Sequence, residues 1–168
     1  ELSIQCRLNG LTFSIDNYVP YDYRSFYNLD VQGKVADYVI IMGYDEHIAV
    51  ADGPGSVASI EFVQRGIEKT LALVPAEKVI NGVPFYTRLW TTTGEIGQVA
   101  YGMQEIENFL ANNGVETVWD EATCQYAAQF TLDGVGYAVW LEEKESLAVK
   151  LNVMNQYNLA GVAGWRLG

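Results

Sequence analysis

Three groups of aromatic, acidic and hydrogen-bonding residues follow runs of apolar sequence. The first is Tyr44, Asp45, Glu46 and His47 after the run at 35–42, the second is Tyr86, Arg88 and Trp90 after the run at 79–85, and the third is Trp165 and Arg166. Aromatic rings stack on the apolar faces of a sugar ring, while polar side chains form directed hydrogen bonds with its hydroxyl and amide groups. The mixture therefore predicts a sugar-binding site, and it suits a phosphate poorly.

Each group also has a plainer structural interpretation. Tyrosine and tryptophan at strand ends commonly pack around the rim of a sheet, and Asp45 with Glu46 could belong to a solvated loop. His47 is compatible with a loop residue whose hydrogen bonds are satisfied. A catalytic pair formed by Asp45 and Glu46 is not expected. Two-carboxylate glycosidases place these groups on opposite sides of the scissile bond, about 5 to 10 Å apart, and adjacent residues rarely do so.

The composition excludes several classes of protein. The chain has 168 residues, 49% of them hydrophobic and 18% charged, which is enough apolar sequence to form a core. Its net charge of −11 argues against a nucleic-acid partner and against an anionic membrane surface. No run approaches the roughly 20 apolar residues of a membrane span, and no export leader opens the sequence. Because the sequence begins at Glu1 in the middle of a pattern, we interpret it as a piece of a longer chain.

Metal and cofactor chemistry is not expected. Cys6 and Cys124 have neither metal-type spacing nor a disulfide framework, and a single histidine, His47, cannot form a multi-histidine metal site. The sequence contains no Gly-x-Ser-x-Gly, Walker or Gly-x-Gly-x-x-Gly motif. We therefore predict no metal and no cofactor.

Hydrophobic periodicity places the three groups on an α/β framework. Strands are predicted at 11–19, 35–42 and 79–85, and the β-branched run at 35–42 suits a strand covered on both faces. Ser56 is a plausible N-cap for a helix that extends to Val74. A helix at 144–157 and a strand at 162–166 complete the α/β pattern. In α/β barrels, residues at the carboxyl ends of the strands meet on one face.

The stretch 90–141 has a different pattern. A short amphipathic helix that ends at Asn113-Gly114 is followed by runs at 115–119, 125–131 and 135–141. Asp133-Gly134 between the last two runs predicts a tight hairpin. We interpret 90–141 as a small α+β insertion.

Four ordered segments carry a recognisable pattern. They are Ile41-Met42-Gly43-Tyr44-Asp45-Glu46-His47, the segment GVPFYTRLW at 82–90, VWLEE at 139–143 with Ser146 and Lys150, and LAGVAGWRLG at 159–168. Together they resemble glycoside hydrolase family 18, the chitinase family, and within it the branch of spore-cortex and cell-wall N-acetylglucosaminidases. The resemblance covers essentially the whole chain. It implies an α/β fold that is the C-terminal half, strands five to eight, of a TIM (β/α)8 barrel. Residues 1–89 and 142–168 would form the partial barrel, with 90–141 inserted after the seventh strand.

The resemblance also implies roles for individual residues. In this family the substrate's own N-acetyl oxygen attacks the anomeric carbon, while a glutamic acid protonates the leaving oxygen. Tyr44 would donate a hydrogen bond to the acetyl carbonyl and Asp45 would orient the sugar. Trp165 would form the floor of the subsite and Met42 would line it. The weaker candidates for walls and flanking subsites are His47, Tyr86, Arg88, Trp90 and Glu142.

The family motif Asp-x-x-Asp-x-Asp-x-Glu, which carries the general acid, does not occur in this sequence. The resemblance implies that the parent hydrolyses β-1,4-linked N-acetylglucosamine polymers, peptidoglycan or chitin. Because the general-acid motif is missing here, we expect this chain alone to be inactive. A non-catalytic chitinase-like carbohydrate-binding protein is the alternative, and an acidic α/β domain whose aromatic residues only pack is a third. The open sheet predicts a missing barrel half or self-association. The resemblance alone implies a location in the cell wall, in the spore or outside the cell.

Overall fold

Two β-sheets organise the chain, which the computed structural model describes over residues 1–20 and 27–167. A parallel sheet has the strand order β1-β2-β3-β9, and an antiparallel sheet has the order β5-β4-β8-β7-β6. The strands are β1 (Ser14–Tyr18), β2 (Tyr38–Met42), β3 (Val79–Pro84), β4 (Tyr86–Thr91), β5 (Gly97–Gly102), β6 (Val118–Asp120), β7 (Gln125–Leu132), β8 (Val135–Trp140) and β9 (Gly161–Trp165).

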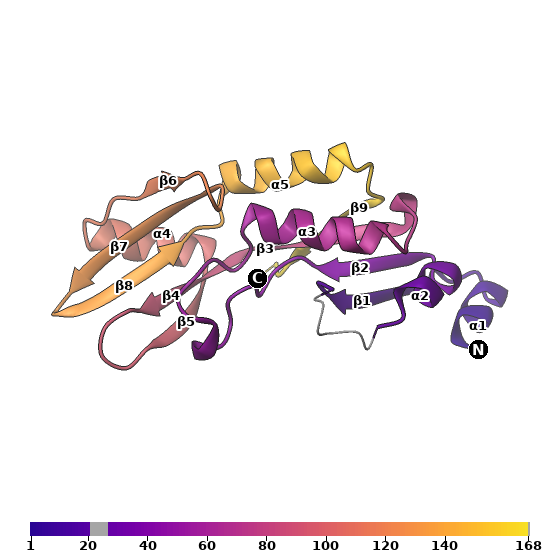
Figure 1. Ribbon diagram of the computed structural model, residues 1–168, viewed down its shortest axis with the longest axis horizontal. Coiled ribbons are helices and arrows are strands. Elements are labelled where there is room, and N and C mark those ends of the chain that lie inside the picture. The colour runs from indigo at the N-terminus through magenta and orange to yellow at the C-terminus, as the bar shows by residue number, and fades with distance from the viewer. Residues whose placement is uncertain (21–26, 168) are drawn as a thin grey trace.

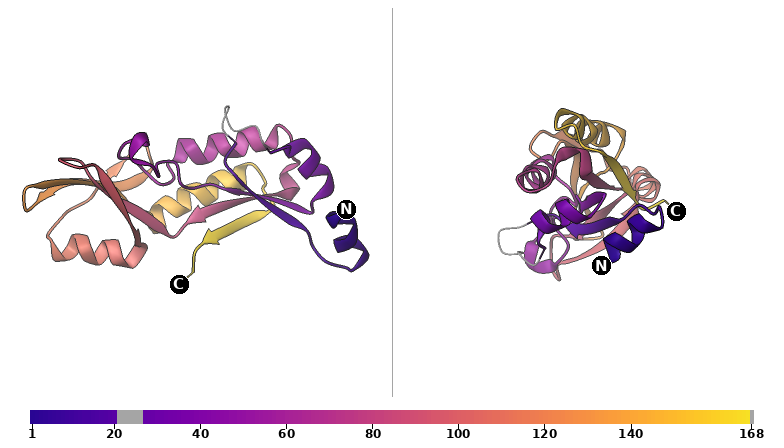
Figure 2. Two further views of the ribbon diagram at one scale, coloured as in Figure 1. Left: turned by 90° about the horizontal axis from the view of Figure 1, so that it is seen from below. Right: turned by 90° about the vertical axis from the view of Figure 1, so that its right-hand side faces the viewer.

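The helices occupy the connections between these strands. They are α1 (Leu2–Leu8), α2 (Leu29–Val35), α3 (Ile60–Leu71), α4 (Met103–Asn112) and α5 (Lys144–Gln156), with 3-10 turns η1 (Val50–Asp52) and η2 (Ala76–Lys78). The molecule is elongated, with α1 at one end and the β7–β8 hairpin at the other (Figures 1 and 2). No helix in the described ranges has both the length and the apolar character that a membrane crossing requires.

The parallel sheet has one covered face. Val39 and Ile41 of β2 and Val79 and Val83 of β3 are buried, and they join one core with the apolar side of α3. Helices α3 and α5 pack against each other, and α3 also packs against β3 and α5 against β9 (Figure 1). The four predicted parallel strands are confirmed, since each pairs in register with its neighbour.

No helix or strand among the described residues forms a covering layer on the opposite face of the parallel sheet. Tyr18, Tyr38 and Trp165 point to this side and are 46%, 38% and 54% exposed. The prediction that the strand at 35–42 is covered on both faces is therefore wrong for this chain. The sheet is open and does not close into a barrel within the described residues.

The N-cap of helix α3 lies three residues after the predicted N-cap at Ser56. It is Ser59, whose hydroxyl accepts a hydrogen bond from the backbone N–H of Phe62 at 3.2 Å. The Ser56 hydroxyl instead accepts the N–H of Ala58 at 2.9 Å. The local sequence contains two candidate caps, and the tertiary contacts of Ser56 decide between them.

The antiparallel sheet begins at Tyr86, before the predicted insertion boundary at 90. β4 pairs with β5 in a hairpin that the sequence did not predict, and α4 packs on this sheet. The predicted Asp133-Gly134 hairpin is confirmed. Both residues have positive φ, 50° and 80°, as a type I′ turn requires. Gly168, the last residue of the matched sequence, lies outside the described residues.

Candidate functional site

Asp45 is the polar centre of the group at the carboxyl ends of the parallel strands. It follows β2 by three residues and has φ of 63°, which turns the chain sharply away from the sheet. Its Oδ1 atom accepts hydrogen bonds from the Tyr86 hydroxyl at 2.5 Å and from the Arg88 guanidinium at 2.9 Å. The side chains of Arg88 and Asp45 are only 12% and 23% exposed, so water screens this ion pair less than it would a surface pair. Asp45 Oδ1 is thereby held in place, while Oδ2 accepts no hydrogen bond from the residues that the structure describes.

Arg88 connects Asp45 to the β4–β5 hairpin. Its second terminal nitrogen donates to Gln98 Oε1 at 2.8 Å, and Gln98 Nε2 donates to the carbonyl of Ile48 at 3.3 Å. The guanidinium carbon lies 5.7 Å from the centroid of the Tyr86 ring. Arg88 Nε is buried and has no hydrogen-bond partner among the described residues.

Tyr44 and Tyr86 form an aromatic corner beside Asp45. Their ring centroids are 6.2 Å apart and their planes meet at 76°, an edge-to-face arrangement. Burial raises the pKa of both phenols. The neighbouring charge of Asp45 raises both further, and for Tyr86 so does the hydrogen bond to Asp45. Both phenols are therefore protonated at neutral pH, and Tyr86 donates its hydroxyl hydrogen to Asp45.

Strand register places Tyr44 and Trp165 at the same end and on the same face of the parallel sheet. Met42 pairs with Gly82, which pairs with Ala163. Trp165 ends β9 two residues beyond this row, and Tyr44 follows the last residue of β2 by two positions, with β3 lying between β2 and β9. Tyr44 also lies over Gly82, since a Cβ added there would be 3.1 Å from Tyr44 Cε1. Neighbouring strands are about 4.8 Å apart, so roughly 10 Å separates the backbones of β2 and β9.

A cavity of about 680 Å³ opens beside Asp45 and Trp165. It is lined by Asp45, Phe85, Tyr86, Arg88, Ala100, Tyr101, Gly102, Met103, Gln104, Glu105, Trp165 and Arg166. The Phe85 N–H donates to the Trp165 carbonyl at 2.6 Å, which ties the start of β4 to the end of β9. The structure therefore brings together five predicted residues: Asp45, Tyr86, Arg88 and Trp165 in the cavity wall, and Tyr44 against Tyr86.

Met42 and His47 are not among the cavity-lining residues. Met42 is half-buried on the open face of β2, in the row below Tyr44. His47 Nδ1 lies 3.1 Å from the carbonyl oxygen of Gly53, and because a carbonyl only accepts, this nitrogen carries the proton. The imidazole packs on Gly55, where an added Cβ would lie 2.5 Å from the ring. His47 thus supports its own loop.

The structure removes Trp90 and Glu142 from the predicted subsite walls. Trp90 is 0% exposed and Glu142 is 1% exposed, so neither side chain is accessible to a ligand. Trp90 donates its indole N–H to the Gly55 carbonyl at 2.9 Å, and Glu142 forms a buried ion pair with Lys150. Alternation along β4 does place Trp90 on the same face as Arg88. The loop that contains Gly55 covers that end of the strand.

Sequence reasoning missed the part of the cavity wall formed by β5 and the start of α4. Tyr101, Met103 and Glu105 line the cavity there, and the Glu105 carboxylate caps its own helix by accepting the Gly102 N–H at 2.9 Å. The available signal was the capping pattern before the amphipathic helix, which would have fixed the start of α4. Within the described ranges, no three His, Cys, Asp or Glu side chains lie close enough together to hold a metal ion.

Comparison with known proteins gives a consistent family. The model of "Glycosyl hydrolases family 18" matches residues 5–168. YdhD of Bacillus subtilis (strain 168), whose name describes a sporulation-specific glycosylase, is 32% identical over 156 residues, which is 88% of this chain and 34% of YdhD. Its crystal structure has a TM-score of 0.91 at 26% identity and covers 99% of this chain and 58% of that one.

Two further proteins are similar. The cortical fragment-lytic enzyme of Bacillus subtilis (strain 168) is 27% identical over 155 residues, which is 90% of this chain and 34% of the enzyme. The crystal structure of a chitinase from Chromobacterium violaceum has a TM-score of 0.88 at 28% identity, covering 99% of this chain and 54% of that one. The chain thus spans about a third of the length of YdhD and of the cortical fragment-lytic enzyme.

Proposed function

The chain belongs to glycosyl hydrolases family 18, and on that premise we propose that it is the C-terminal half of the catalytic domain of a glycosidase that cleaves β-1,4-linked N-acetylglucosamine polymers. The observation that carries the proposal is the convergence of Asp45, Tyr86, Arg88 and Trp165 on one cavity at the carboxyl ends of the parallel strands. In barrels of parallel strands, the reacting groups gather at this end. The names of the relatives describe glycosylases, cortex-lytic enzymes and chitinases, which favours peptidoglycan or chitin as the substrate.

The proposed chemistry is substrate-assisted. The acetamido oxygen of the reacting sugar attacks the anomeric carbon, while a glutamic acid from outside this sequence protonates the leaving oxygen. Tyr44 donates its phenolic hydrogen to the acetamido group and stabilises the charge that develops there. A phenol is protonated at neutral pH, and burial beside Asp45 raises the pKa of Tyr44 further. Asp45, held on one oxygen by Tyr86 and Arg88, keeps the other oxygen for orienting the acetamido N–H.

Trp165 provides the apolar floor in this proposal. Its side chain is 54% exposed and lines the cavity, as a stacking platform for a pyranose must. Met42 lies on the same face of the sheet below Tyr44 and would line the inner end of the subsite.

The open face of the parallel sheet supports the proposal that this chain is one half of a barrel. Tyr18 and Tyr38 on this face are exposed, and within the described part of the chain β1 and β9 are the edge strands of an open sheet. Further strands of a longer chain would cover this face and close the barrel. Without them, the exposed edges and face favour self-association. We place the protein in the cell envelope or outside the cell, by analogy with the cortex-lytic relatives.

A non-catalytic carbohydrate-binding protein is the alternative function. Such a protein would keep the cavity and bind oligosaccharides without turnover.

The deciding experiment uses the full-length protein with Tyr44→Phe, Trp165→Ala and the control Tyr38→Phe. Tyr38 lies on the same face of the sheet but at the opposite end of β2. Release of reducing ends from N-acetylglucosamine oligomers and from cortex peptidoglycan measures turnover, and calorimetry measures binding. Tyr44→Phe should lower kcat by about 10²- to 10³-fold, Trp165→Ala should weaken binding, and Tyr38→Phe should change neither. Wild-type binding without turnover would establish the alternative, and unchanged binding by Trp165→Ala would refute the sugar site.

A further inference from the structure

We infer that Trp90 and Gln125, two buried side chains of the antiparallel sheet, are positioning residues for Asp45. They act through the loop at 43–59, which joins β2 to α3 and contains Asp45. The inference rests on the proposed function, because it assigns Asp45 to the reacting site. In this proposal the antiparallel sheet lines the cavity and also holds the loop at 43–59, which contains Asp45.

Trp90 provides the first attachment. Its indole N–H donates to the carbonyl of Gly55 at 2.9 Å, from a side chain with no solvent exposure. Gly55 is itself in contact with the His47 ring, so that any Cβ there would collide with the imidazole. A buried hydrogen bond to a buried backbone carbonyl fixes the height of the loop above β4, since neither group has water as a replacement partner.

Gln125 of β7 provides the second attachment. Its amide nitrogen donates to Glu142 Oε1 at 2.8 Å and to the Leu141 carbonyl at 3.1 Å. Because both of these partners can only accept, the amide oxygen must face the other way, where it accepts the Ser56 hydroxyl hydrogen. The Ser56 oxygen in turn accepts the Ala58 N–H. The donor and acceptor directions along this chain are therefore fixed.

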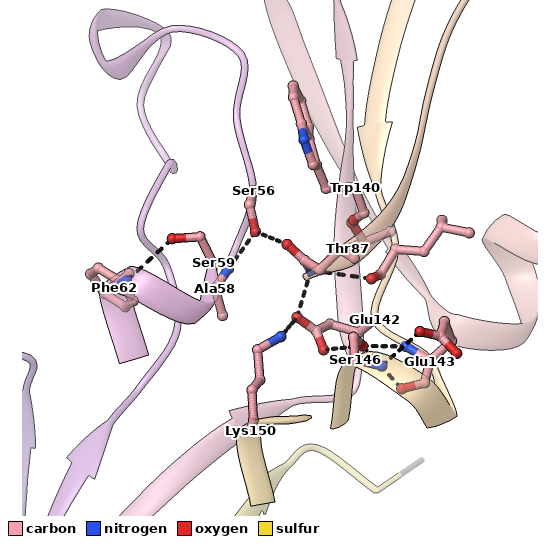
Figure 3. Close-up of polar contacts among 12 residues, drawn as sticks. Ser56, Ala58, Ser59, Phe62, Thr87, Trp140, Glu142, Glu143, Ser146 and Lys150 are labelled. Atoms are coloured by element: carbon pink, nitrogen blue, oxygen red, sulfur yellow. Dashed lines mark hydrogen bonds and ion pairs between the residues drawn. The ribbon is translucent and has the colours of Figure 1, made fainter. Parts of the chain in front are cut away.

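A buried ion pair keeps Gln125 in this orientation. Lys150 of α5 donates to the same Glu142 Oε1 atom, and the Ser146 hydroxyl lies 3.0 Å from Oε2 (Figure 3). Ser146 and Lys150 are four residues apart on consecutive turns of α5, and Glu142 precedes the first residue of that helix by two positions. Ser146 and Lys150 matched the family sequence without an assigned task, and Glu142 was predicted as a subsite wall. The geometry assigns all three the support of Gln125.

The loop transmits these attachments to Asp45 through its neighbour Glu46. The Glu46 N–H donates to the Val57 carbonyl at 2.9 Å, which closes the base of the loop. The Glu46 carboxylate accepts the backbone N–H of Ser59 at 2.8 Å and its hydroxyl at 3.0 Å. A shift of the segment at 55–59 therefore moves Glu46, and with it the adjacent Asp45. A misplacement of about 1 Å at a reacting group can cost about 10²-fold in rate.

The test compares Trp90→Phe and Ser56→Ala with the control Trp140→Phe in the full-length protein. Trp140 also belongs to the antiparallel sheet, but its indole N–H bonds Asp120 at 3.3 Å and does not contact the loop. We expect Trp90→Phe and Ser56→Ala to lower kcat on N-acetylglucosamine oligomers about tenfold with little change in KM, and Trp140→Phe to leave both unchanged. In an Asp45→Asn background the same two changes should lower kcat less than twofold, since the residue they position has lost its function.

Hydrogen exchange of the amides at 45–59 gives a readout that does not require turnover. Exchange should become faster in Trp90→Phe and Ser56→Ala and stay unchanged in Trp140→Phe. If wild-type protein releases no product, the proposed function fails, and faster exchange still shows that the antiparallel sheet holds the loop. Unchanged exchange in both variants overturns the inference. So does a loss of kcat that is equally large with Asp45 and with Asn at position 45.

Discussion

The buried pair Glu142–Lys150 allows a sharp prediction about stability. Replacing Lys150 by Met removes the ammonium group while keeping most of the apolar stem. The side chains of Lys150 and Glu142 are 1% and 0% exposed, so the carboxylate left behind has no access to water. Breaking a buried ion pair by removing one partner typically costs about 3–5 kcal/mol. Burial already raises the pKa of Glu142, a shift that Lys150 opposes. Loss of Lys150 therefore favours protonation of Glu142 and leaves the carboxyl short of a donor.

A second substitution separates the charge from the hydrogen bonds. Glu142→Gln in the Lys150→Met background removes the isolated charge and keeps an acceptor for one of the two donors, Gln125 and Ser146. Each donor left unpaired costs about 1–3 kcal/mol. We therefore expect the double variant to recover about 2 kcal/mol relative to Lys150→Met alone, without reaching the stability of the wild type.

The assay is urea denaturation of the full-length protein at pH 7, with Lys34→Met as the matched control. Lys34 pairs with Asp30 at 2.6 Å, but the two side chains are 69% and 52% exposed. Exposed pairs contribute about 0–1 kcal/mol, so the same chemical change should have a small effect there. If Lys150→Met costs no more than Lys34→Met, or if the double variant is less stable than Lys150→Met, the reasoning about the isolated buried charge is refuted.

Three further outcomes are expected. Because burial and the Asp45 hydrogen bond raise the pKa of Tyr86, the folded state keeps a proton that the unfolded state loses above about pH 10. Wild-type Tm should therefore fall more steeply than that of Tyr86→Phe between pH 9 and about pH 11, and parallel curves would contradict this. Ser59→Ala should cost about 1–2 kcal/mol in denaturation, because α3 loses its N-cap and Glu46 loses a donor. Residues 1–168 expressed alone should elute as oligomers in size-exclusion chromatography. A compact monomer would count against the open-sheet argument.

Local sequence predicted the parallel strands well because their signal is a simple one. The central strands β2 and β3 are rich in β-branched apolar residues, and alternate positions such as Val39 and Ile41 face one core. Helix α2 was missed for a physical reason. It has only seven residues and contains Gly33, which normally disfavours a helix. An added Cβ at Gly33 would lie 3.3 Å from Val74, so the glycine allows close packing that no local pattern reports.

The candidate site was predictable in its residue types but only partly in its geometry. The position of Asp45 after a parallel strand predicted its place at the carboxyl end of the sheet, and the two donors to its Oδ1 atom come from nearby positions of β4. Trp90 follows the same alternation and still lies outside the cavity, since the loop at 43–59 covers it. Whether a loop folds over a strand end depends on contacts with residues far away in the sequence, such as that between Ser56 and Gln125.

The passage from the parallel to the antiparallel sheet explains why Asp45 takes its partners from the latter. β3 ends at Pro84 and β4 begins at Tyr86, so a single residue, Phe85, separates a strand of one sheet from a strand of the other. The Phe85 N–H is bonded to the Trp165 carbonyl, which fixes the direction in which β4 leaves. Tyr86 and Arg88 therefore keep a set distance from Trp165. Because Asp45 is bonded to both Tyr86 and Arg88, the backbone fixes its position relative to Trp165. The attachments of the loop to Trp90 and Gln125 then need only keep Asp45 within hydrogen-bonding reach of Tyr86 and Arg88.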